Sequence, residues 1–269
     1  MSCLGVMATS LNNLEVFKQK IQRAEVCVGV GVSLCDPAIS ELFAEVGYDF
    51  TWIDMEHTVL SLETVLGHVM AVRGTGTAPF VRVPWNDPVL IKPVLELEPA
   101  AIIVPMVRNA AETAKAVAAC KYPPNGIRGF GPRRGIRFGG MSTMDYLKEA
   151  DDHVMVIVQV EHIDAVNDLD AILEIPGLDG VVLGPNDLSG SMGKLGRTSD
   201  PDVVAAIDEV IAKVRRSKKT IGASVGYSPE SVRRWLAKGL HWIAVGEDTD
   251  NLYSYSKTAL DDVRSIRAK

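Results

Sequence analysis

The 269-residue sequence predicts a single α/β domain, a (β/α)8 TIM barrel with an extra N-terminal helix. Eight strand-like segments alternate with eight helix-like segments over about 245 residues, which is the size and rhythm of such a barrel. Several strand-like segments are continuous apolar runs, as parallel strands buried on both faces should be. No linker or shift of composition divides the chain, so we expect a helical extension at residues 1–25 and the barrel at 26–269. A doubly wound sheet is the structural alternative, disfavoured because no glycine-rich phosphate fingerprint follows the first strand.

The predicted strands are short apolar runs, and most are bounded by turn-forming or polar residues. They lie at residues 26–34, 48–53, 78–83, 100–104, 154–161, 180–183, 220–225 and 241–245. The first of them contains Gly29 and Gly31, which indicate a close approach of another chain segment to its backbone.

The predicted helices are marked by helical spacing of apolar residues and by capping signals. The segment 11–24 has Leu14, Phe17 and Ile21 on one face, which indicates an amphipathic helix before the barrel. Asp-Pro pairs open three later helices, because Asp caps a helix N-terminus and Pro suits its first turn. The barrel helices are predicted at residues 36–45, 61–73, 87–96, 109–121, 163–173, 200–217, 228–238 and 251–267.

Two connections are unusually long and rich in glycine. Residues 122–140 form a polar segment with Pro, Gly and Arg, and a loop of this length is more often functional than incidental. Its arginines could attract an acidic substrate, with a solvated loop or a subunit contact as the alternative; they are Arg128, Arg133, Arg134 and Arg137. Residues 189–199 form the second such loop.

Composition and charge exclude several classes of protein. The chain is 47% hydrophobic and 23% charged, which is ordinary for a globular protein, and its net charge of −6 argues against non-specific nucleic-acid binding. No apolar run approaches the roughly 20 residues that span a bilayer, and residues 1–10 lack the basic start of a secretory signal. We therefore expect a cytoplasmic protein without a nucleic-acid or membrane partner.

The four cysteines are predicted to be free thiols in a reducing cytosol. They are Cys3, Cys27, Cys35 and Cys120, and none forms the CxxC pair that marks a zinc site. Cys27 and Cys35 flank the first strand and are expected in the core.

Polar residues stand where two successive predicted strands end, at the rim where barrel enzymes carry their active sites. The run 180–183 breaks at Gly184-Pro185 and then presents Asp187, while the run 154–161 ends in Gln159 and Glu161. Two carboxylates at neighbouring strand ends suit a hard divalent cation such as Mg²⁺ or Mn²⁺. Ion pairs at the barrel rim are the alternative interpretation.

Two further strand ends carry groups suited to acid–base and anion chemistry. His57 could act as a general base, with Asp54 orienting it, or could simply cap a helix. Arg82 interrupts an apolar strand, so it needs an anion to offset its desolvation, either a keto-acid oxygen or a neighbouring carboxylate. No lysine sits at a strand end, which disfavours a Schiff-base mechanism.

Six ordered motifs resemble the class II pyruvate aldolases of the 4-hydroxy-2-oxoheptanedioate aldolase family. They are Asp54-Met55-Glu56-His57, the segment from Val81 to Pro88, Val104-Pro105-Met106-Val107, the segment from Tyr122 to Gly129, Gln159-Val160-Glu161 and the segment from Gly184 to Ser189. The resemblance runs from about residue 14 to the C-terminus. Relatives include dehydro-deoxy-galactarate and keto-deoxy-rhamnonate aldolases and, more distantly, macrophomate synthase, all barrels like those of the phosphoenolpyruvate/pyruvate superfamily.

The resemblance implies reversible retro-aldol cleavage of a 4-hydroxy-2-oxo acid to pyruvate and an aldehyde, through a metal-bound pyruvate enolate. Glu161 and Asp187 would be the ligands of Mg²⁺ or Mn²⁺, with Co²⁺ as a further possibility. Arg82 would stabilise the enolate, and His57 would act through water on the C4 hydroxyl. The substrate would meet Gln159 near the pyruvate carbonyl and the segment Gly184, Pro185, Asn186 and Asp187, whose last two backbone amides would receive the carboxylate. The family further implies a hexamer whose barrels pair through the last helix.

Four positions depart from the family pattern. Glu96 stands where relatives have an Asp that supports the histidine of a neighbouring subunit, and Pro99 replaces a usual glycine. Gly31 stands where an aromatic residue often lines the pocket, and Ser224 where a leucine often meets the aldehyde. These two changes predict a wider and more polar aldehyde pocket.

Three other functions are compatible with the same residues. An oxaloacetate decarboxylase or a macrophomate-synthase-like carbon–carbon bond-forming enzyme would use the same enolate. A CoA-ester lyase of the citrate-lyase type is another, although the sequence has no dedicated CoA-binding feature. A non-catalytic barrel that binds a keto acid is the third, and the combination of His57, Arg82, Glu161 and Asp187 argues against it.

Overall fold

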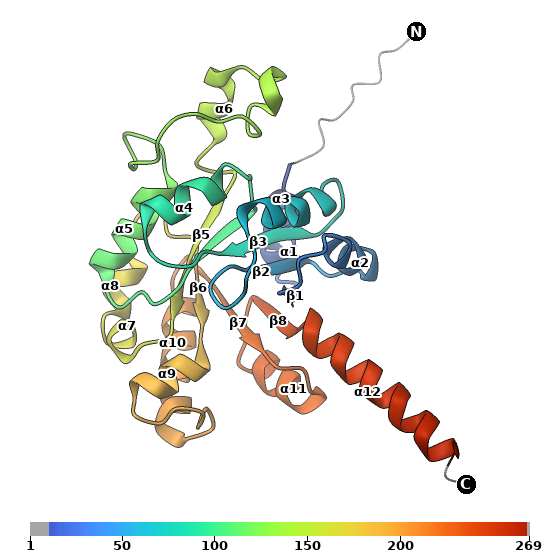
Figure 1. Cartoon of the computed structure of the whole chain (residues 1–269). Coiled ribbons are helices and arrows are strands. Elements are labelled where there is room, and N and C mark those ends of the chain that lie inside the picture. Colours follow the sequence, from blue (N-terminus) through green and yellow to red (C-terminus); the bar gives the residue numbers. More distant parts are fainter. Residues whose placement is uncertain (1–10, 268–269) are drawn as a thin grey trace.

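Eight parallel strands close into a barrel surrounded by helices in the computed structural model, which describes residues 11–267 (Figure 1). The strands pair in chain order, and the last pairs with the first. They are β1 (Cys27–Val32), β2 (Phe50–Asp54), β3 (Ala78–Arg82), β4 (Ala101–Val104), β5 (Met155–Val160), β6 (Gly180–Leu183), β7 (Thr220–Val225) and β8 (Trp242–Glu247). The predicted barrel is therefore confirmed.

The helices that cover the barrel lie close to their predicted positions. They are α2 (Ala38–Val46), α3 (Leu62–Ala71), α4 (Pro88–Leu95), α5 (Ala110–Cys120), α10 (Pro201–Arg216), α11 (Pro229–Ala237) and α12 (Asp248–Arg267). Two of the three Asp-Pro signals act as expected: the Asp87 carboxylate accepts a hydrogen bond from the amide of Val89 at 2.7 Å, and Asp200 accepts one from Asp202 at 3.2 Å. At the third, Pro37 rather than Asp36 immediately precedes α2, although the Asp36 carboxylate accepts a hydrogen bond from the amide of Ala38 at 3.0 Å. None of the helices in residues 11–267 is both long and apolar enough to cross a bilayer.

The helix before the barrel, α1 (Leu14–Gln22), closes the N-terminal end of the barrel. The Phe17 ring lies 4.9 Å from that of Phe80 and 5.9 Å from that of Phe50, measured between centroids. Residues 1–10 of the expected extension, with Cys3, lie outside the described residues, so the boundary at residue 25 stays a prediction.

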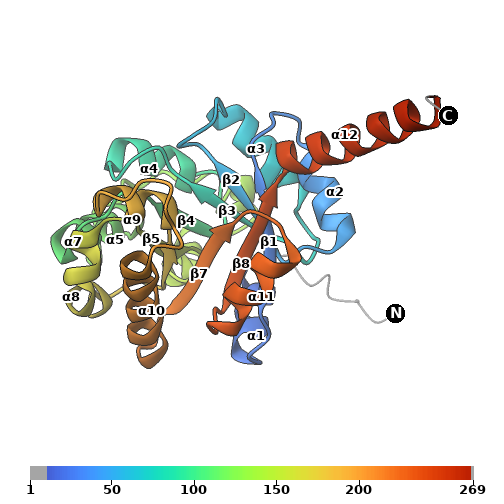
Figure 2. The ribbon, with the colours of Figure 1, turned by 90° about the horizontal axis from the view of Figure 1, so that it is seen from below.

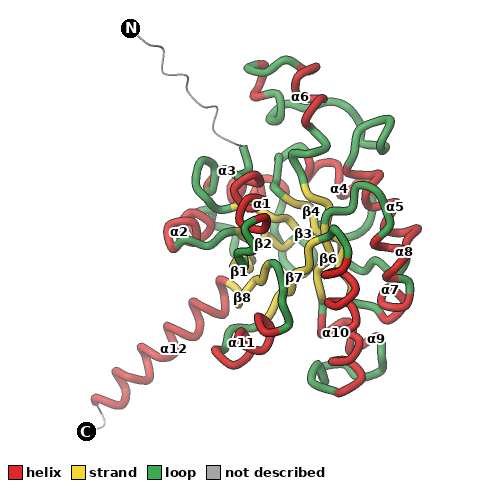
Figure 3. The backbone as a smooth tube through the Cα atoms, turned by 180° about the vertical axis from the view of Figure 1, so that it is seen from behind, coloured by secondary structure: helices red, strands yellow, loops and turns green. Residues whose placement is uncertain are grey.

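Four short helices depart from the predicted elements. The predicted helix 163–173 is two helices, α7 (Ile163–Asn167) and α8 (Leu169–Leu173), which meet at Asp168. The Asp168 carboxylate accepts a hydrogen bond of 2.7 Å from the amide of Ala110, the first residue of α5. The residue at the break therefore contacts the start of another helix. The polar segment after α5 is followed by α6 (Thr143–Glu149), which lies away from the barrel (Figure 3). The loop predicted to start at residue 189 starts later, because α9 (Pro185–Ser191) follows β6.

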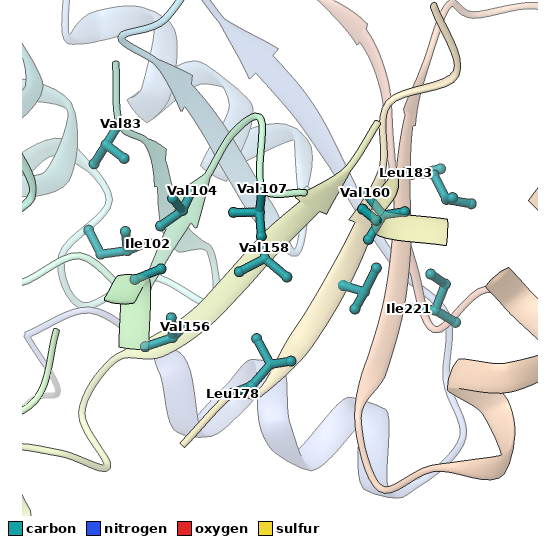
Figure 4. Close-up of a cluster of buried hydrophobic side chains, with 14 of the residues drawn as sticks. Val83, Ile102, Val104, Val107, Val156, Val158, Val160, Leu178, Leu183 and Ile221 are labelled. Carbon is teal, nitrogen blue, oxygen red and sulfur yellow. The ribbon is translucent and has the colours of Figure 1, made fainter. Parts of the chain in front are cut away.

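Alternation of side chains along each strand divides the core into two layers. In β5, Val156 and Val158 face the helices, as does Val104 of β4 in the outer layer shown in Figure 4. Met155 and Ile157 face the barrel interior, and the same period of two points Gln159 inward above them. The inner layer is completed by aromatic rings from neighbouring strands, with Phe50 stacked on Phe80 at a centroid distance of 4.8 Å. The rim positions above this layer therefore point into the mouth of the barrel.

The cysteine prediction is correct for Cys27 but wrong for Cys35. Cys27 and Cys120 are buried free thiols, and burial raises the pKa of each to about 12, so neither is reactive at neutral pH. Cys35 is exposed because it follows β1 on the connection to α2, beyond the region that the helices cover.

Candidate active site

A cavity of about 200 Å³, the rim cavity, opens at the C-terminal ends of the strands. Most of the residues predicted for the site line it, drawn from five strands and the turns after them. They are Asp54, His57, Arg82, Gln159, Gly184, Pro185, Asn186, Asp187 and Ser224. The predicted convergence of distant strand ends at one place is therefore observed, whereas the roles assigned to these residues stay predictions.

Arg82 is held in the cavity floor by two carboxylates. Its Nε lies 2.9 Å from Asp54 Oδ1 and one terminal nitrogen 2.7 Å from Asp54 Oδ2, while the other lies 2.9 Å from Glu56 Oε2. Burial lowers the pKa of Arg82, but the hydrogen bond and charge of Asp54 and the charge of Glu56 outweigh it and raise the pKa above its usual value. The guanidinium also lies over the ring of Trp52, 5.4 Å from the centroid. A permanently charged group with fixed orientation thus faces the cavity.

The expected support of His57 by Asp54 is not what the structure shows. The Asp54 carboxylate accepts hydrogen bonds from Arg82 and from the backbone amides of Glu56 at 2.9 Å and His57 at 3.5 Å, but it does not reach the imidazole. The imidazole is 64% exposed, and its Nε2 lies 3.7 Å from Glu56 Oε2. Asp54 pairs with Arg82 because a guanidinium and a carboxylate form two parallel charge-assisted hydrogen bonds.

Glu56 is a site residue that the sequence reasoning left without a role. It connects Arg82 and His57, and desolvation raises its pKa, as do the nearby Asp54 and Asp187 charges, against the opposing effect of Arg82 and His57. Its Oε2 is buried without a hydrogen bond of good geometry in residues 11–267. Two features of the sequence indicate that Glu56 belongs to the site: it follows an apolar strand, and it directly precedes His57.

Glu161 directly follows β5, is 2% exposed and does not itself line the rim cavity. Its Oε1 accepts a hydrogen bond of 2.7 Å from the amide of Met106, and its Oε2 accepts one from the Gln159 amide nitrogen. Burial raises the pKa of Glu161 to about 7, and the charges of Glu56 and Asp187 act in the same direction. Met106 has a φ of 56°, a left-handed conformation that costs about 1–3 kcal/mol in a non-glycine residue and here directs an amide at this carboxylate.

The residues around Glu161 fit a divalent cation. Within residues 11–267 there is no cluster of three or more His, Cys, Asp or Glu side chains arranged to hold a metal. Mg²⁺, however, commonly takes only one or two carboxylates and completes its shell with water and substrate oxygens. Glu161 and Asp187 supply two, and the Oε1 of Gln159 is a buried oxygen without a hydrogen-bond partner in the described part of the chain. A cation there would offset the negative charges of Glu56 and Asp187, which add to the effect of burial in raising the pKa of Glu161.

Glu96 does not line the rim cavity. Its carboxylate lies 3.1 Å from a terminal nitrogen of Arg128, whose side chain is buried. Arg134 is buried as well and donates to the carbonyl of Leu97 at 2.6 Å. These two arginines connect the segment 122–150 to the turn after α4, so both are paired within the chain rather than available to attract a substrate. A role of Glu96 in a neighbouring subunit stays a prediction.

The space left by the missing side chain at Gly31 is occupied in part by another residue of the same rim. A Cβ atom on Gly31 would lie 2.7 Å from Cγ of Glu247, which lines the cavity from the end of β8. Desolvation raises the pKa of Glu247, as do the charges of Asp250 and Asp54. The expected widening at this position is therefore partly filled by Glu247, whereas Ser224 on the neighbouring strand β7 is exposed.

Gly184 has no space for a side chain. A Cβ atom there would lie 2.5 Å from Glu161 Oε2, 2.7 Å from Glu161 Cβ and 2.9 Å from Gln159 Nε2. We therefore expect Gly184→Ala to displace the carboxylate and to lower kcat/KM for the protein's reaction by about a hundredfold, since small misplacements at a site are this costly. The free energy of unfolding should fall by only about 1–3 kcal/mol.

The matched control is Gly76→Ala, because a Cβ atom at Gly76 would meet nothing within 4 Å. Activity should remain at the wild-type level in this variant. Equal activity of the two variants would contradict the close packing of Gly184 against Glu161.

Comparisons with known proteins place the chain among aldolases. Residues 28–254 match the HpcH/HpaI aldolase/citrate lyase family. The 4-hydroxy-2-oxo-heptane-1,7-dioate aldolase of Shigella sonnei is 38% identical over 233 residues, which cover 87% of this chain and 88% of that protein. The HpcH/HpaI aldolase structure from Desulfitobacterium hafniense superimposes with a TM-score of 0.85 at 26% identity, covering 92% of this chain and 96% of the other. The citrate synthase SbnG superimposes with a TM-score of 0.84 at 27% identity, over 96% of this chain and all of the other.

Proposed function

Because the chain belongs to the HpcH/HpaI aldolase/citrate lyase family, we propose that it is a divalent-metal-dependent pyruvate aldolase. The coarser prediction, a carbon–carbon lyase of the aldolase type, is confirmed by that membership. The proposed reaction is the reversible cleavage of a 4-hydroxy-2-oxo acid to pyruvate and an aldehyde. One observation supports it above all: a largely buried guanidinium, fixed by two carboxylates, faces the same cavity as Asp187 and Gln159, and Gln159 donates a hydrogen bond to buried Glu161.

The metal would be held by the carboxylates of Glu161 and Asp187. When bound, a divalent cation polarises the oxygens of a keto acid and so favours formation of an enolate. Mg²⁺, Mn²⁺ and Co²⁺ are all compatible with oxygen ligands of this kind.

The chain's own residues would bind the keto acid and stabilise its charge. The amides of Asn186 and Asp187 lie in the first turn of α9, where backbone N–H groups lack an intrahelical acceptor, and we assign them to the pyruvate carboxylate. Gln159 would lie beside the carbonyl. Arg82 would stabilise the negative charge that develops on the C2 oxygen, and Asp54 and Glu56 hold it in place before the reaction begins.

Bond cleavage requires a proton to leave the C4 hydroxyl. His57 would accept that proton through a water molecule, since an imidazole can take up a proton near neutral pH. The C4 oxygen then forms the aldehyde carbonyl as the C3–C4 bond breaks, and the electron pair of that bond forms the C2–C3 double bond of the enolate. Protonation at C3 completes pyruvate. The exposed position of the imidazole leaves room for the water.

The direct test is cleavage of a 4-hydroxy-2-oxo acid with pyruvate release as the readout, before and after treatment with EDTA. We expect activity to be lost on chelation and restored by Mg²⁺ or Mn²⁺. Activity that is unaffected by complete removal of divalent ions would contradict the proposal.

A second candidate uses the same enolate for carbon–carbon bond formation or for decarboxylation of an oxaloacetate-like acid. The similarity to the citrate synthase SbnG supports it, because that protein shares the fold at 27% identity. Parallel measurement of oxaloacetate turnover and aldol cleavage separates the two. A kcat/KM for oxaloacetate far above that for every 4-hydroxy-2-oxo acid would favour the second candidate.

We further propose that the enzyme is a hexamer whose barrels pair through α12. This helix extends away from the barrel in Figures 1 and 2, and its residues from Thr249 to Arg267 are all exposed. It carries an apolar stripe at intervals of three and four residues, which one face of a helix presents to a partner. The stripe consists of Leu252, Tyr255, Ala259, Val263 and Ile266.

Charges within this stripe should weaken assembly. We expect the double variant Leu252→Lys/Val263→Lys to shift the molar mass, measured by light scattering after size-exclusion chromatography, toward that of the monomer. The control Ser254→Lys/Ser265→Lys places the same charges on the opposite face and should leave the molar mass unchanged. A monomeric wild-type protein would contradict the assembly. The cytoplasmic location expected from the sequence stays a prediction.

A further inference from the structure

A second cavity of about 200 Å³ adjoins the rim cavity. It lies between α10 and α11, beyond the ends of β6 and β7. Pro185, Asn186 and Ser224 line both cavities, so the small side chain of Ser224 stands at their common boundary. Each cavity alone is smaller than the roughly 300–1,000 Å³ of ordinary ligand pockets, and the two together reach that range.

The second cavity has an apolar wall and a charged end. Val204 and Ile207 of α10 and Trp235 of α11 supply the wall. Arg234 and Lys238 supply positive charge, but the Lys238 ammonium forms an ion pair with Asp208. No side chain within residues 11–267 forms an ion pair or hydrogen bond with Arg234, which leaves its guanidinium available to a ligand. A guanidinium binds carboxylate and phosphate groups especially well.

We propose that the second cavity is the subsite for the far end of the aldehyde half of the substrate, and that Arg234 selects aldehydes with an anionic terminus. This inference rests on the proposed aldolase function. The pyruvate half occupies the rim cavity beside Arg82, and the chain beyond C4 passes Ser224 into the second cavity. Its methylene groups contact the apolar wall, and its terminal carboxylate or phosphate pairs with Arg234.

The test compares aldehydes that differ only in terminal charge. Rates of aldol addition to pyruvate are measured for 4-oxobutanoate and for its neutral methyl ester, and for glyceraldehyde 3-phosphate and glyceraldehyde. The wild-type ratio of kcat/KM, anionic over neutral, should be about ten or more for at least one pair, and Arg234→Ala should lower that ratio by about tenfold, as expected for a lost charge-assisted hydrogen bond at an open site. The pair that shows the effect distinguishes a carboxylate from a phosphate terminus.

Three further variants separate this role from a structural one. Arg233→Ala removes the neighbouring arginine, which is exposed and does not line the cavity, and should leave the ratio unchanged. Arg234→Lys should retain part of the preference. Ser224→Leu narrows the boundary and should lower kcat/KM for 4-oxobutanoate more than for acetaldehyde. An unchanged anionic-to-neutral ratio in Arg234→Ala would overturn the proposal.

Binding of 4-oxobutanoate, measured by saturation-transfer NMR, does not depend on turnover. The wild-type protein should bind it, and Arg234→Ala should bind it about tenfold more weakly. Failure of the aldolase function would appear as no addition product with any aldehyde, even if this difference in binding persisted. Equal binding by both proteins would refute the subsite even if the aldolase reaction proceeded.

Discussion

Replacing Arg82 by alanine should lower the rate of aldol cleavage by at least about a thousandfold. Loss of a single neutral oxyanion donor already costs roughly a hundredfold to a thousandfold, and Arg82 is a full charge in a buried position. Pyruvate C3 proton exchange, followed by NMR in D₂O, should disappear with it, because this exchange requires the same enolate. Substrate affinity should change much less than kcat if the charge acts mainly as the enolate forms.

Arg82→Ala also leaves Asp54 and Glu56 without their common cation, so stability has to be measured alongside activity. Removing one partner of a buried ion pair costs about 3–5 kcal/mol, and circular dichroism at the assay temperature shows whether the variant is folded. Arg82→Lys keeps the charge but cannot reproduce the paired contacts to Asp54, so we expect an intermediate rate. A folded Arg82→Ala variant that exchanges the C3 protons at the wild-type rate would refute the role of Arg82.

The second large effect is expected at Glu161. Glu161→Gln keeps the shape of the side chain and removes its charge, so metal affinity should fall by at least about a hundredfold, with a corresponding loss of cleavage at micromolar Mn²⁺. Calorimetric titration with Mn²⁺ in the presence of pyruvate measures the affinity directly. The unfolding temperature without metal should change little, because an amide in this buried position avoids the cost of a desolvated charge.

Glu98→Gln is the matched control for Glu161→Gln. Glu98 is also buried, and desolvation raises its pKa, but it accepts a hydrogen bond from Tyr146 at 2.9 Å and does not line the rim cavity. Its variant should bind Mn²⁺ as the wild type does. Wild-type metal affinity in Glu161→Gln, or an equal loss in Glu98→Gln, would show that Glu161 is not a ligand.

The barrel and most of its rim were predictable because two periodicities determine them. The alternation of strands and helices predicted the fold, and the inward-facing period of two predicted that Asp54, Arg82 and Gln159 face the mouth of the barrel beyond the inner core. Asp-Pro pairs gave the starts of helices with little error, since capping is a local interaction.

The pairing of side chains within the site could not be predicted, because it depends on which charges meet in three dimensions. Spacing of three residues suggested that Asp54 supports His57, whereas the nearest strong partner is Arg82, 28 positions away. The same holds for Arg128 and Arg134, whose carboxylate and carbonyl partners come from the turn after α4. The break at Asp168 has a similar cause, since its carboxylate serves α5.

Two short helices were missed for a different reason. The start of α6 carried a local signal, because Ser142 accepts a hydrogen bond from the amide of Asp145 at 3.1 Å in the manner of a capping box. The helix α9 contains Gly190 and two serines, which have low helix propensity, and it is held by its place between β6 and the following loop. Tertiary packing overrode local preference there.

We propose that pyruvate bound in the rim cavity is converted to its enolate with the help of a divalent metal. This claim is tested most directly by incubating the wild-type enzyme with pyruvate in D₂O and following the methyl signal by NMR, with Mg²⁺ or Mn²⁺ and with EDTA. We predict replacement of the methyl protons by deuterium in the presence of metal and no replacement above the uncatalysed rate in EDTA. Retention of all methyl protons by a folded, metal-supplied enzyme, or exchange that continues undiminished in EDTA, would contradict the claim.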